Sequence, residues 1–214
     1  MFSNGPSRRS VLAVVVAVFL LGVFISVNYW RSYRDSHQIP DPSAGGEHEQ
    51  LPAGLEGNGK RLAFHDFEWG SANGTVTNLA ISGHSGKQSL RMSQKLSFSP
   101  GIWIKFKDIK PYDSLWIRAT GYVWFSCAPG ELKCYLVATC NHNGVNYKYM
   151  FTDLETANLK PDQWNRVAID YRIPQPVNRE DVLQAYFWYR GVGEMLVDDV
   201  EVKVYAAGRE KGSW

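Results

Sequence analysis

Residues 164 to 173 read WNRVAIDYRI, and apolar side chains alternate in this stretch with polar ones. Val167, Ile169 and Tyr171 fall on one side of an extended chain, whereas Asp170 falls on the other. Apolar residues with a period of two are typical of a β-strand that buries one face and exposes the other. The stretch therefore predicts a strand of an antiparallel sheet that has a core on one side only.

The same period recurs through residues 61 to 206, where short alternating runs are separated by turns rich in Gly, Pro, Asn and Asp. Regularly spaced strands of this kind are the pattern of a sandwich or barrel, and no amphipathic helix of convincing length interrupts them. Asn143-Gly144 predicts a tight hairpin, because these residues readily take the positive φ angles that such a turn needs. We therefore expect an all-β domain, an antiparallel β-sandwich of two packed sheets. The predicted strands are residues 62–67, 76–81, 88–96, 102–106, 114–127, 132–140, 145–151, 164–173, 183–189 and 195–205.

A long apolar run precedes this domain. Residues 11 to 27 read VLAVVVAVFLLGVFISV, and a helix over residues 10 to 30 is long enough to span the ~30 Å hydrocarbon layer of a bilayer. The aromatic residues that close the run suit the bilayer interface, and Arg8-Arg9 modestly favours a cytoplasmic N-terminal tail at residues 1 to 9. The run predicts a single-pass membrane protein whose C-terminal domain lies on the periplasmic or extracellular side.

The alternative is an export signal that is removed from the mature protein. Residues 7 to 12 (SRRSVL) resemble a twin-arginine motif. The apolar run is longer than a usual signal core, however, and no pair of small residues follows it at a cleavage spacing. Retention as an anchor is therefore the preferred interpretation. Residues 31 to 60 are rich in Pro, Gly, His and Glu and predict a flexible linker, and residues 207 to 214 form a C-terminal tail.

The charge of the chain is nearly balanced, with 23 Lys and Arg against 21 Asp and Glu. This balance predicts no broad basic face for nucleic acid. The histidines lack metal-ligand spacing, and no nucleophile, metalloprotease or phosphate-loop motif occurs in the sequence. Asp198 and Asp199 are adjacent carboxylates, but alternation places them on opposite faces of a strand, where they do not form an acid and base pair. We therefore expect a domain that is not an enzyme.

The three cysteines, Cys127, Cys134 and Cys140, fall on the core side of their predicted strands. Buried free thiols that serve as small apolar side chains are the preferred interpretation. An exported location also permits a disulfide between Cys127 and Cys134, across the turn that separates them.

Four short motifs follow one another along the domain: FHDFE at residues 64–68, SGHSGKQSL at 82–90, LKPDQWNRV at 159–167 and LVDDV at 196–200. In this order and spacing they resemble the calcium-binding, jelly-roll carbohydrate-binding modules of the galactose-binding-like superfamily. The resemblance covers residues 64 to 205 and implies that the sandwich is a jelly roll.

The resemblance also implies a structural Ca²⁺ where the first and last strands meet. Glu68 and Asp198 would supply carboxylates, and the turn at residues 85 to 87 would supply backbone carbonyls. These are the hard oxygen ligands that Ca²⁺ prefers. Alternatively, Asp198 and Asp199 are solvated or hydrogen-bonded acids at a bend in the strand.

Modules of this family bind sugars on a sheet face or in edge loops, through aromatic rings flanked by polar groups. Tyr186, Trp188 and Arg190 share one side of their strand and are candidates for the outer face of a sheet. Tyr122 and Trp124 likewise fall on the side of their predicted strand that faces away from the core. Exposed Trp, Tyr and Arg are equally enriched at protein interfaces, so these residues are candidates for binding either a glycan or a protein partner.

The architecture predicts an accessory or scaffold subunit of a membrane protein complex, which binds integral membrane partners through its helix and its exposed sheet face. The alternative is an envelope-tethered carbohydrate-binding module that recognises a glycan by aromatic stacking.

Overall fold

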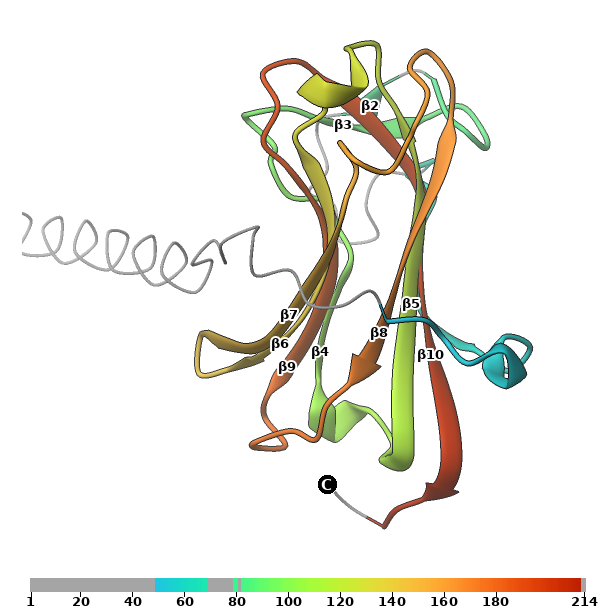
Figure 1. Ribbon diagram of the computed structural model, residues 1–214, viewed down its shortest axis with the longest axis vertical. Helices are drawn as coiled ribbons and strands as arrows, with labels where there is room; N and C mark the ends of the chain where they lie inside the picture. Colours follow the sequence, from blue (N-terminus) through green and yellow to red (C-terminus); the bar gives the residue numbers. More distant parts are fainter. Residues whose placement is uncertain (1–48, 69–78, 81, 213–214) are drawn as a thin grey trace, which may run out of the picture. The chain divides into compact units, whose positions relative to one another are not determined.

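The computed structural model describes residues 49–68, 79–80 and 82–212, which form two antiparallel sheets (Figure 1). The larger sheet has the order β2 (Leu79–Ala80), β3 (Ser89–Met92), β10 (Met195–Glu210), β5 (Tyr112–Trp124) and β8 (Asn165–Ile173), and β1 (Lys60–His65) also pairs with β10. The smaller sheet has the order β4 (Ile102–Lys105), β9 (Val182–Tyr189), β6 (Cys134–His142) and β7 (Val145–Asp153). The prediction of an all-β, antiparallel β-sandwich is confirmed.

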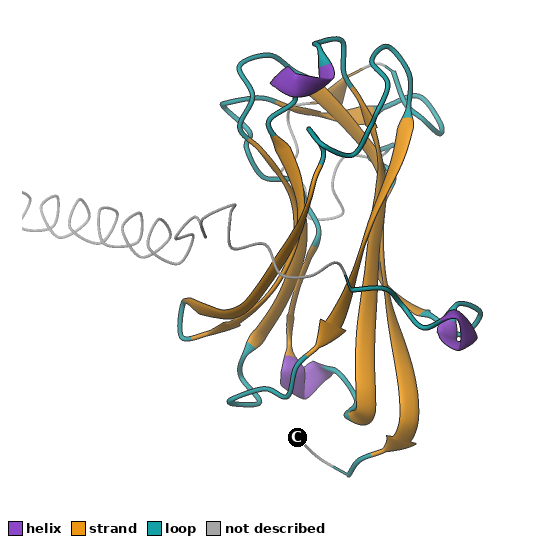
Figure 2. Cartoon of the chain, viewed as in Figure 1, coloured by secondary structure: helices purple, strands orange, loops and turns teal. Residues whose placement is uncertain are grey.

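Short 3-10 turns, drawn as helices in Figure 2, lie in the connecting segments. They are η2 (Ala53–Leu55), η3 (Phe106–Asp108) and η4 (Pro129–Glu131). No helix of the described residues is long and apolar enough to cross a membrane. The predicted membrane helix, residues 10 to 30, and the tail before it lie outside the described residues.

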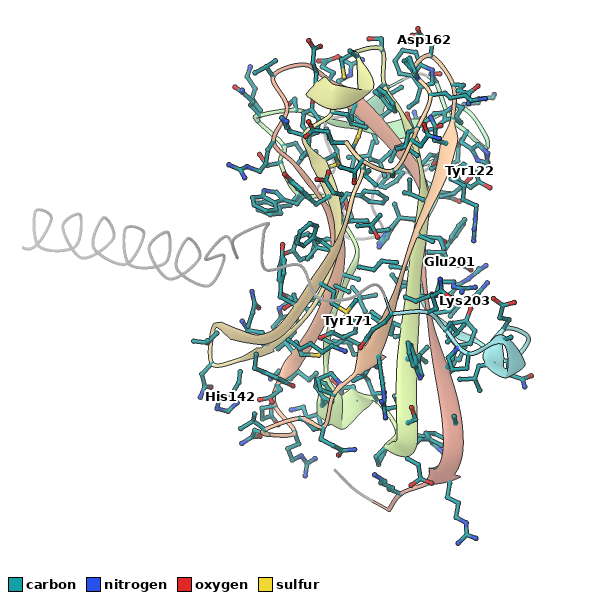
Figure 3. All side chains as sticks on the ribbon, in the orientation of Figure 1. Tyr122, His142, Asp162, Tyr171, Glu201 and Lys203 are labelled. Atoms are coloured by element: carbon teal, nitrogen blue, oxygen red, sulfur yellow. The ribbon has the colours of Figure 1, made fainter. Side chains whose placement is uncertain are left out.

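One hydrophobic core lies between the sheets, because the alternation of the sequence holds along most of the strands. In β8, Val167, Ile169 and Tyr171 are buried and the residues between them are not. Figure 3 shows Tyr171 between the two sheets. The core takes side chains from both sheets, and burial of each large one contributes about 1.5–3 kcal/mol relative to exposure.

The hairpin between β6 and β7 has the predicted tight turn. Asn143 has a φ of 50° and Gly144 a φ of 85°. Positive φ at both central residues is the geometry of a two-residue turn whose twist matches that of the strands it joins. The Asn141 side chain accepts a hydrogen bond from the Gly144 N–H at 2.8 Å and so supports the turn.

Several strands end at other residues than alternation alone predicts. β3 ends at Met92 because Ser93 and Leu96 close a turn through two backbone hydrogen bonds of 3.2 and 3.0 Å. β1 ends at His65, and Phe67 takes a φ of 58°, which does not continue a strand. β10 continues to Glu210, where it still pairs with β5.

All three cysteines carry free thiols. Cys134 and Cys140 are buried in the core, and Cys127 packs against it. Burial raises the pKa of the Cys140 thiol to about 12 and that of Cys134 further still. The thiols in the core are therefore neutral at physiological pH and act as small apolar side chains.

One side of the sandwich is closed by hydrogen bonds from side chains to backbone between β7 and β8. Thr152 Oγ1 donates to the Ala168 carbonyl at 3.2 Å, and the Tyr171 hydroxyl donates to the Lys148 carbonyl at 3.1 Å. The Lys148 ammonium donates in turn to the Arg172 carbonyl. These bonds join the edge strand of one sheet to the edge strand of the other.

Residues 49 to 59, the end of the predicted linker, pack on the outer face of the larger sheet. The Leu51 N–H donates to the Asp170 carboxylate at 2.9 Å, and Arg118 donates to the same carboxylate through two nitrogens. Burial alone would raise the pKa of Asp170, but these bonds outweigh it and lower the pKa. Arg118 also pairs with Glu56 at 3.1 Å. This part of the outer face is therefore covered by the protein's own chain.

The start of β4 approaches β9 so closely that only glycine fits there. A Cβ added at Gly101 would overlap the carbonyl oxygen of Ala185, whereas one added at Gly54 would meet nothing within 4 Å. We expect Gly101→Ala to lower the free energy of unfolding by about 1–3 kcal/mol, because β4 must move away from β9. Gly54→Ala is the matched control and should leave the stability unchanged. Urea denaturation of the full chain measures both, and equal stability of the two variants would contradict the expected packing.

Candidate functional site

Aromatic side chains gather on the outer face of the smaller sheet. Along β9, alternate residues are buried in the core, and Tyr186 and Trp188, which lie between them, are half-buried on the outer side. The register places Tyr186 opposite Val137 of β6, and Trp188 opposite Tyr135. On the far side of β6, Val137 lies opposite Phe151 of β7. The sequence therefore placed Tyr186 and Trp188 on the correct side of their strand.

The rings form one continuous series across the strands. Phe98, in the segment before β4, stacks on Trp188 with a centroid distance of 6.2 Å and an interplanar angle of 6°. Tyr135 lies 5.4 Å from Trp188 and 5.4 Å from Phe151, measured between centroids. We call this surface the aromatic face, and its members are Phe98, Tyr135, Tyr149, Phe151, Tyr186 and Trp188.

Polar groups border the aromatic face. The Arg190 guanidinium lies 5.0 Å from the centroid of the Trp188 ring, in the range of a cation–π contact. Burial raises the pKa values of the Tyr135 and Tyr149 hydroxyls, so both stay protonated at neutral pH and can donate hydrogen bonds. On β4, Trp103 is 63% exposed beside Gln184 and adds a further ring at the edge of the sheet.

Sequence reasoning named Tyr186, Trp188 and Arg190 but missed the other members of this surface. Alternation along β6 carried the signal for Tyr135, because Cys134 next to it had been assigned to the core side of its strand. For Phe151 the signal was the alternation within β7, where the neighbouring Met150 is buried. Phe98 carried no such signal, since it lies outside the regular strands and reaches Trp188 through an isolated bridge.

Tyr122 and Trp124 lie elsewhere. Both are on β5 and point away from the core, so they are on the outer face of the larger sheet, on the opposite side of the sandwich from the aromatic face. Figure 3 shows Tyr122 there. The His84 ring stacks on Tyr122 with centroids 3.4 Å apart and planes at 12°, and it covers one face of the tyrosine. The five predicted residues thus form two groups, not one site.

The predicted calcium ligands Glu68 and Asp198 both bind the loop at residues 82–88. Glu68 Oε1 accepts hydrogen bonds from the N–H groups of Lys87 at 2.6 Å and Gln88 at 2.8 Å. Asp198 Oδ2 accepts from the N–H of His84 at 2.7 Å and the N–H of the next residue at 3.2 Å. The two carboxylates fasten this loop to the last strand and to the end of the first.

Asp199 corrects the expectation that it points away from Asp198. Its oxygens accept hydrogen bonds from His84 Nδ1 and Ser85 Oγ, both at 2.7 Å, so both acids face the same loop. The cause is the backbone: Asp199 has a φ of 47°, and the pairing register shifts between Asp198 and Glu201. A left-handed residue at a β-bulge interrupts the alternation on which the expectation rested.

These acids do not form a recognisable catalytic group. In a serine hydrolase the hydroxyl donates to a histidine that takes its proton. Here Ser85 and His84 both donate to Asp199, so the histidine does not lie between the serine and the acid.

Asp181 is a buried acid in another loop. It is 2% exposed and accepts hydrogen bonds from His142 Nδ1 and from two backbone N–H groups. Burial would raise the pKa of Asp181, but these bonds outweigh it and lower the pKa, which suits a structural role in its loop.

The hydrogen bonds that Glu68 and Asp198 accept favour a structural role, in which they hold the loop at residues 82–88, over the role of metal ligands. The carboxylate oxygens described above already accept backbone N–H groups, and Asp198 Oδ1 accepts the Asp199 N–H at 2.8 Å. The described residues contain no group of three or more His, Cys, Asp and Glu that could hold a metal ion. Binding of Ca²⁺ through these carboxylates and loop carbonyls stays a prediction.

Comparison with known proteins gives structural neighbours but no sequence family. No family model and no curated protein matches the chain. The CBM22-1 xylan-binding domain of Xyn10C from Paenibacillus barcinonensis is 17% identical, with a TM-score of 0.44 over 70% of this chain and 97% of that one. The CBM22-1-CBM22-2 tandem of the same protein is 17% identical, with a TM-score of 0.48 over 76% and 50%.

A third neighbour is the C-terminal family 22 carbohydrate-binding module of Xyn10B from Clostridium thermocellum. It is 14% identical, with a TM-score of 0.44 over 67% of this chain and 92% of that one. The structural neighbours are thus carbohydrate-binding modules. Likenesses at this level of identity and TM-score do not establish a ligand for this chain.

If Ca²⁺ binds at Glu68 and Asp198, it stabilises the folded state, because a ligand that binds only that state adds free energy of unfolding. The calcium prediction requires millimolar Ca²⁺ to raise the thermal midpoint of the full chain above its value in a chelator, whereas a clamp of hydrogen bonds alone requires equal midpoints. Glu68→Gln should abolish the rise, and the exposed Glu131→Gln should keep it. Identical midpoints with Ca²⁺ and with chelator would refute the calcium prediction.

Asp198 predicts a distinct pH dependence of stability. The side chain is 0% exposed, and burial raises its pKa from 3.8 to about 6 although backbone hydrogen bonds oppose the shift. Because the folded state then holds this proton more tightly than the unfolded state, the contribution of Asp198 to stability falls as pH rises from 3.8 to about 6. The test compares the free energy of unfolding of the wild type with that of Asp198→Asn in metal-free buffer. The wild-type value minus the variant value should fall by about 3 kcal/mol across this pH window. Parallel pH profiles in urea denaturation would show that the carboxyl is not perturbed.

Proposed function

We propose that the β-sandwich is a non-catalytic module that binds a glycan on the aromatic face. The observation that carries this proposal is the continuous series of rings from Phe98 through Trp188 and Tyr135 to Phe151. A module of this kind needs an exposed surface of stacking rings with polar groups at its border. On the outer face of the smaller sheet, the rings of Phe98, Trp188 and Phe151 are partly open to solvent, and Tyr135 lies between them at 8% exposure. The Arg190 guanidinium supplies a polar group at the border.

The chemistry of a sugar matches this surface. One face of a pyranose ring presents C–H groups, which gain from contact with an aromatic ring because apolar area leaves water, at about 25 cal/mol per Å². The sugar hydroxyls need hydrogen-bond partners when they are desolvated. The protonated Tyr135 and Tyr149 hydroxyls and the Arg190 guanidinium stand at the rings and can meet this need.

The direction of the series favours a chain of sugars over a single one. Neighbouring strands lie about 4.8 Å apart, so the rings on β9, β6 and β7 span roughly 10 Å across the sheet. Phe98 extends the series beyond β9. An oligosaccharide that crosses the strands can contact several rings at once, whereas a monosaccharide contacts one or two.

The larger sheet fits this role less well. Residues 49 to 59 pack on part of its outer face, and Arg118 and Asp170 there are joined by hydrogen bonds. Tyr122 is covered on one face by His84.

The module would act at a membrane if the apolar run at residues 10 to 30 is retained as an anchor, with the sandwich on the periplasmic or extracellular side. The earlier prediction, an accessory subunit with integral membrane partners, rests on that anchor and stays a prediction. Purification in mild detergent tests it, because a protein that elutes alone and monomeric argues against a stable complex.

We expect Trp188→Ala to abolish binding on a glycan array or to weaken it at least tenfold, since it removes the central ring of the series. Trp124→Ala is the matched control: it removes an aromatic side chain from the outer face of the other sheet and should leave binding unchanged. Thermal unfolding checks that both variants fold. Loss of binding in Trp124→Ala alone would move the site to the larger sheet. The absence of any glycan ligand for the wild-type protein would refute the proposed function.

A further inference from the structure

A basic cavity lies at the end of the sandwich where β10 finishes, the end at which the β10 arrowhead is drawn in Figure 1. Its volume is about 410 Å³, within the range of small-molecule sites. Three segments that are far apart in the sequence form its walls: residues 107–111, Arg179 in the loop before β9, and residues 210–212. The aromatic face is on a different surface, so this cavity is independent of the proposed glycan site.

Hydrogen bonds between backbone groups hold the walls in place. The Lys107 N–H donates to the Arg179 carbonyl at 2.9 Å, and the Lys211 N–H donates to the Pro111 carbonyl at 2.8 Å. Phe106 and Ile109 are buried beneath the first wall. The cavity is therefore formed before any ligand arrives, which lowers the entropic cost of binding.

The charges around the cavity are unequal. The lining contains four basic side chains, Lys107, Lys110, Arg179 and Lys211, and two acidic ones, Asp108 and Glu210. Lys110 pairs with Glu210 at 3.0 Å. Lys107 shares the carboxylate of Glu180 with Lys105, so one acid serves two amines.

Arg179 and Lys211 have no ion-pair partner among the residues that the structure describes. The second amine of the Lys105–Glu180–Lys107 group offsets the charge of Asp108, so the cavity and its rim keep a surplus of two positive charges, equal to the charge of Arg179 and Lys211. Arg179 contributes a planar guanidinium fork, which matches two oxygens of a phosphate, and Lys211 contributes a compact point charge.

We propose that this cavity binds a phosphate monoester. A monoester carries a charge of about −1.5 to −2 near neutral pH, which is equal in size and opposite in sign to the surplus left by Arg179 and Lys211. The phosphodiester of a lipid headgroup carries only a single charge and leaves one of the two cations unmatched. The ligand class is therefore a small phosphorylated metabolite or a phosphorylated sugar.

The test is titration calorimetry of the full chain in a neutral detergent, with three probes: inorganic phosphate, a hexose phosphate and glycerophosphoglycerol, the soluble diester of a lipid headgroup. We expect saturable binding of the first two and weaker binding of the diester. Arg179→Gln combined with Lys211→Gln should raise the dissociation constant for the hexose phosphate about tenfold or more, because two charge-assisted contacts are lost.

Lys95→Gln is the matched control, since it removes an exposed basic side chain in the turn after β3 and should leave the dissociation constant unchanged. Equal loss of affinity in this control, tighter binding of the diester, or no saturable binding of phosphate or hexose phosphate would each overturn the proposal. Glycan-array binding of the double variant should match the wild type. Failure here is thus distinguishable from failure of the aromatic face.

Discussion

The structure depends most on the pairing of β10, which uses both of its edges. One edge pairs with β5 from Leu196 to Glu210, and the other pairs with β3 and then with β1. Backbone N–H and C=O groups that leave water without partners cost free energy, so a long central strand fixes its neighbours. β10 also carries the acids that hold the loop at residues 82–88, and it ends in the wall of the basic cavity. A change in its register would shift all of these features together.

Alternation of apolar and polar residues predicted the fold class, the two-layer architecture and the side on which Tyr186 and Trp188 lie. It succeeded because packing between the sheets demands a period of two wherever the backbone is regular. It failed at Asp199, where a positive φ reverses the side on which the carboxylate lies. It could not place Phe98, whose contact with Trp188 is made across space from an irregular segment. The sequence pattern also could not show that residues 49 to 59 bind the larger sheet, because that contact depends on hydrogen bonds to Asp170 and Arg118.

The two outer faces of the sandwich have different chemistry although both belong to antiparallel sheets. On the larger sheet, ion pairs and residues from the end of the linker occupy the surface. On the smaller sheet, aromatic rings contact one another across three strands and no described ion pair separates Trp188, Tyr135 and Phe151. Contiguous apolar surface that remains partly open to solvent is typical of interaction sites, which is the physical basis for proposing that this face binds a ligand.

The side-chain bonds between β7 and β8 protect the protein from association with itself. An edge strand offers unpaired N–H and C=O groups to a second copy, and long edges are the most hazardous. β7 and β8 each have nine residues, and they face each other through Thr152, Lys148 and Tyr171. Among the described strands, the remaining open edges belong to β1, β2 and β4, of six, two and four residues, and to residues 205–210 of β10, which pair with β5 alone. Short edges of this kind are poor templates for association between copies of the chain.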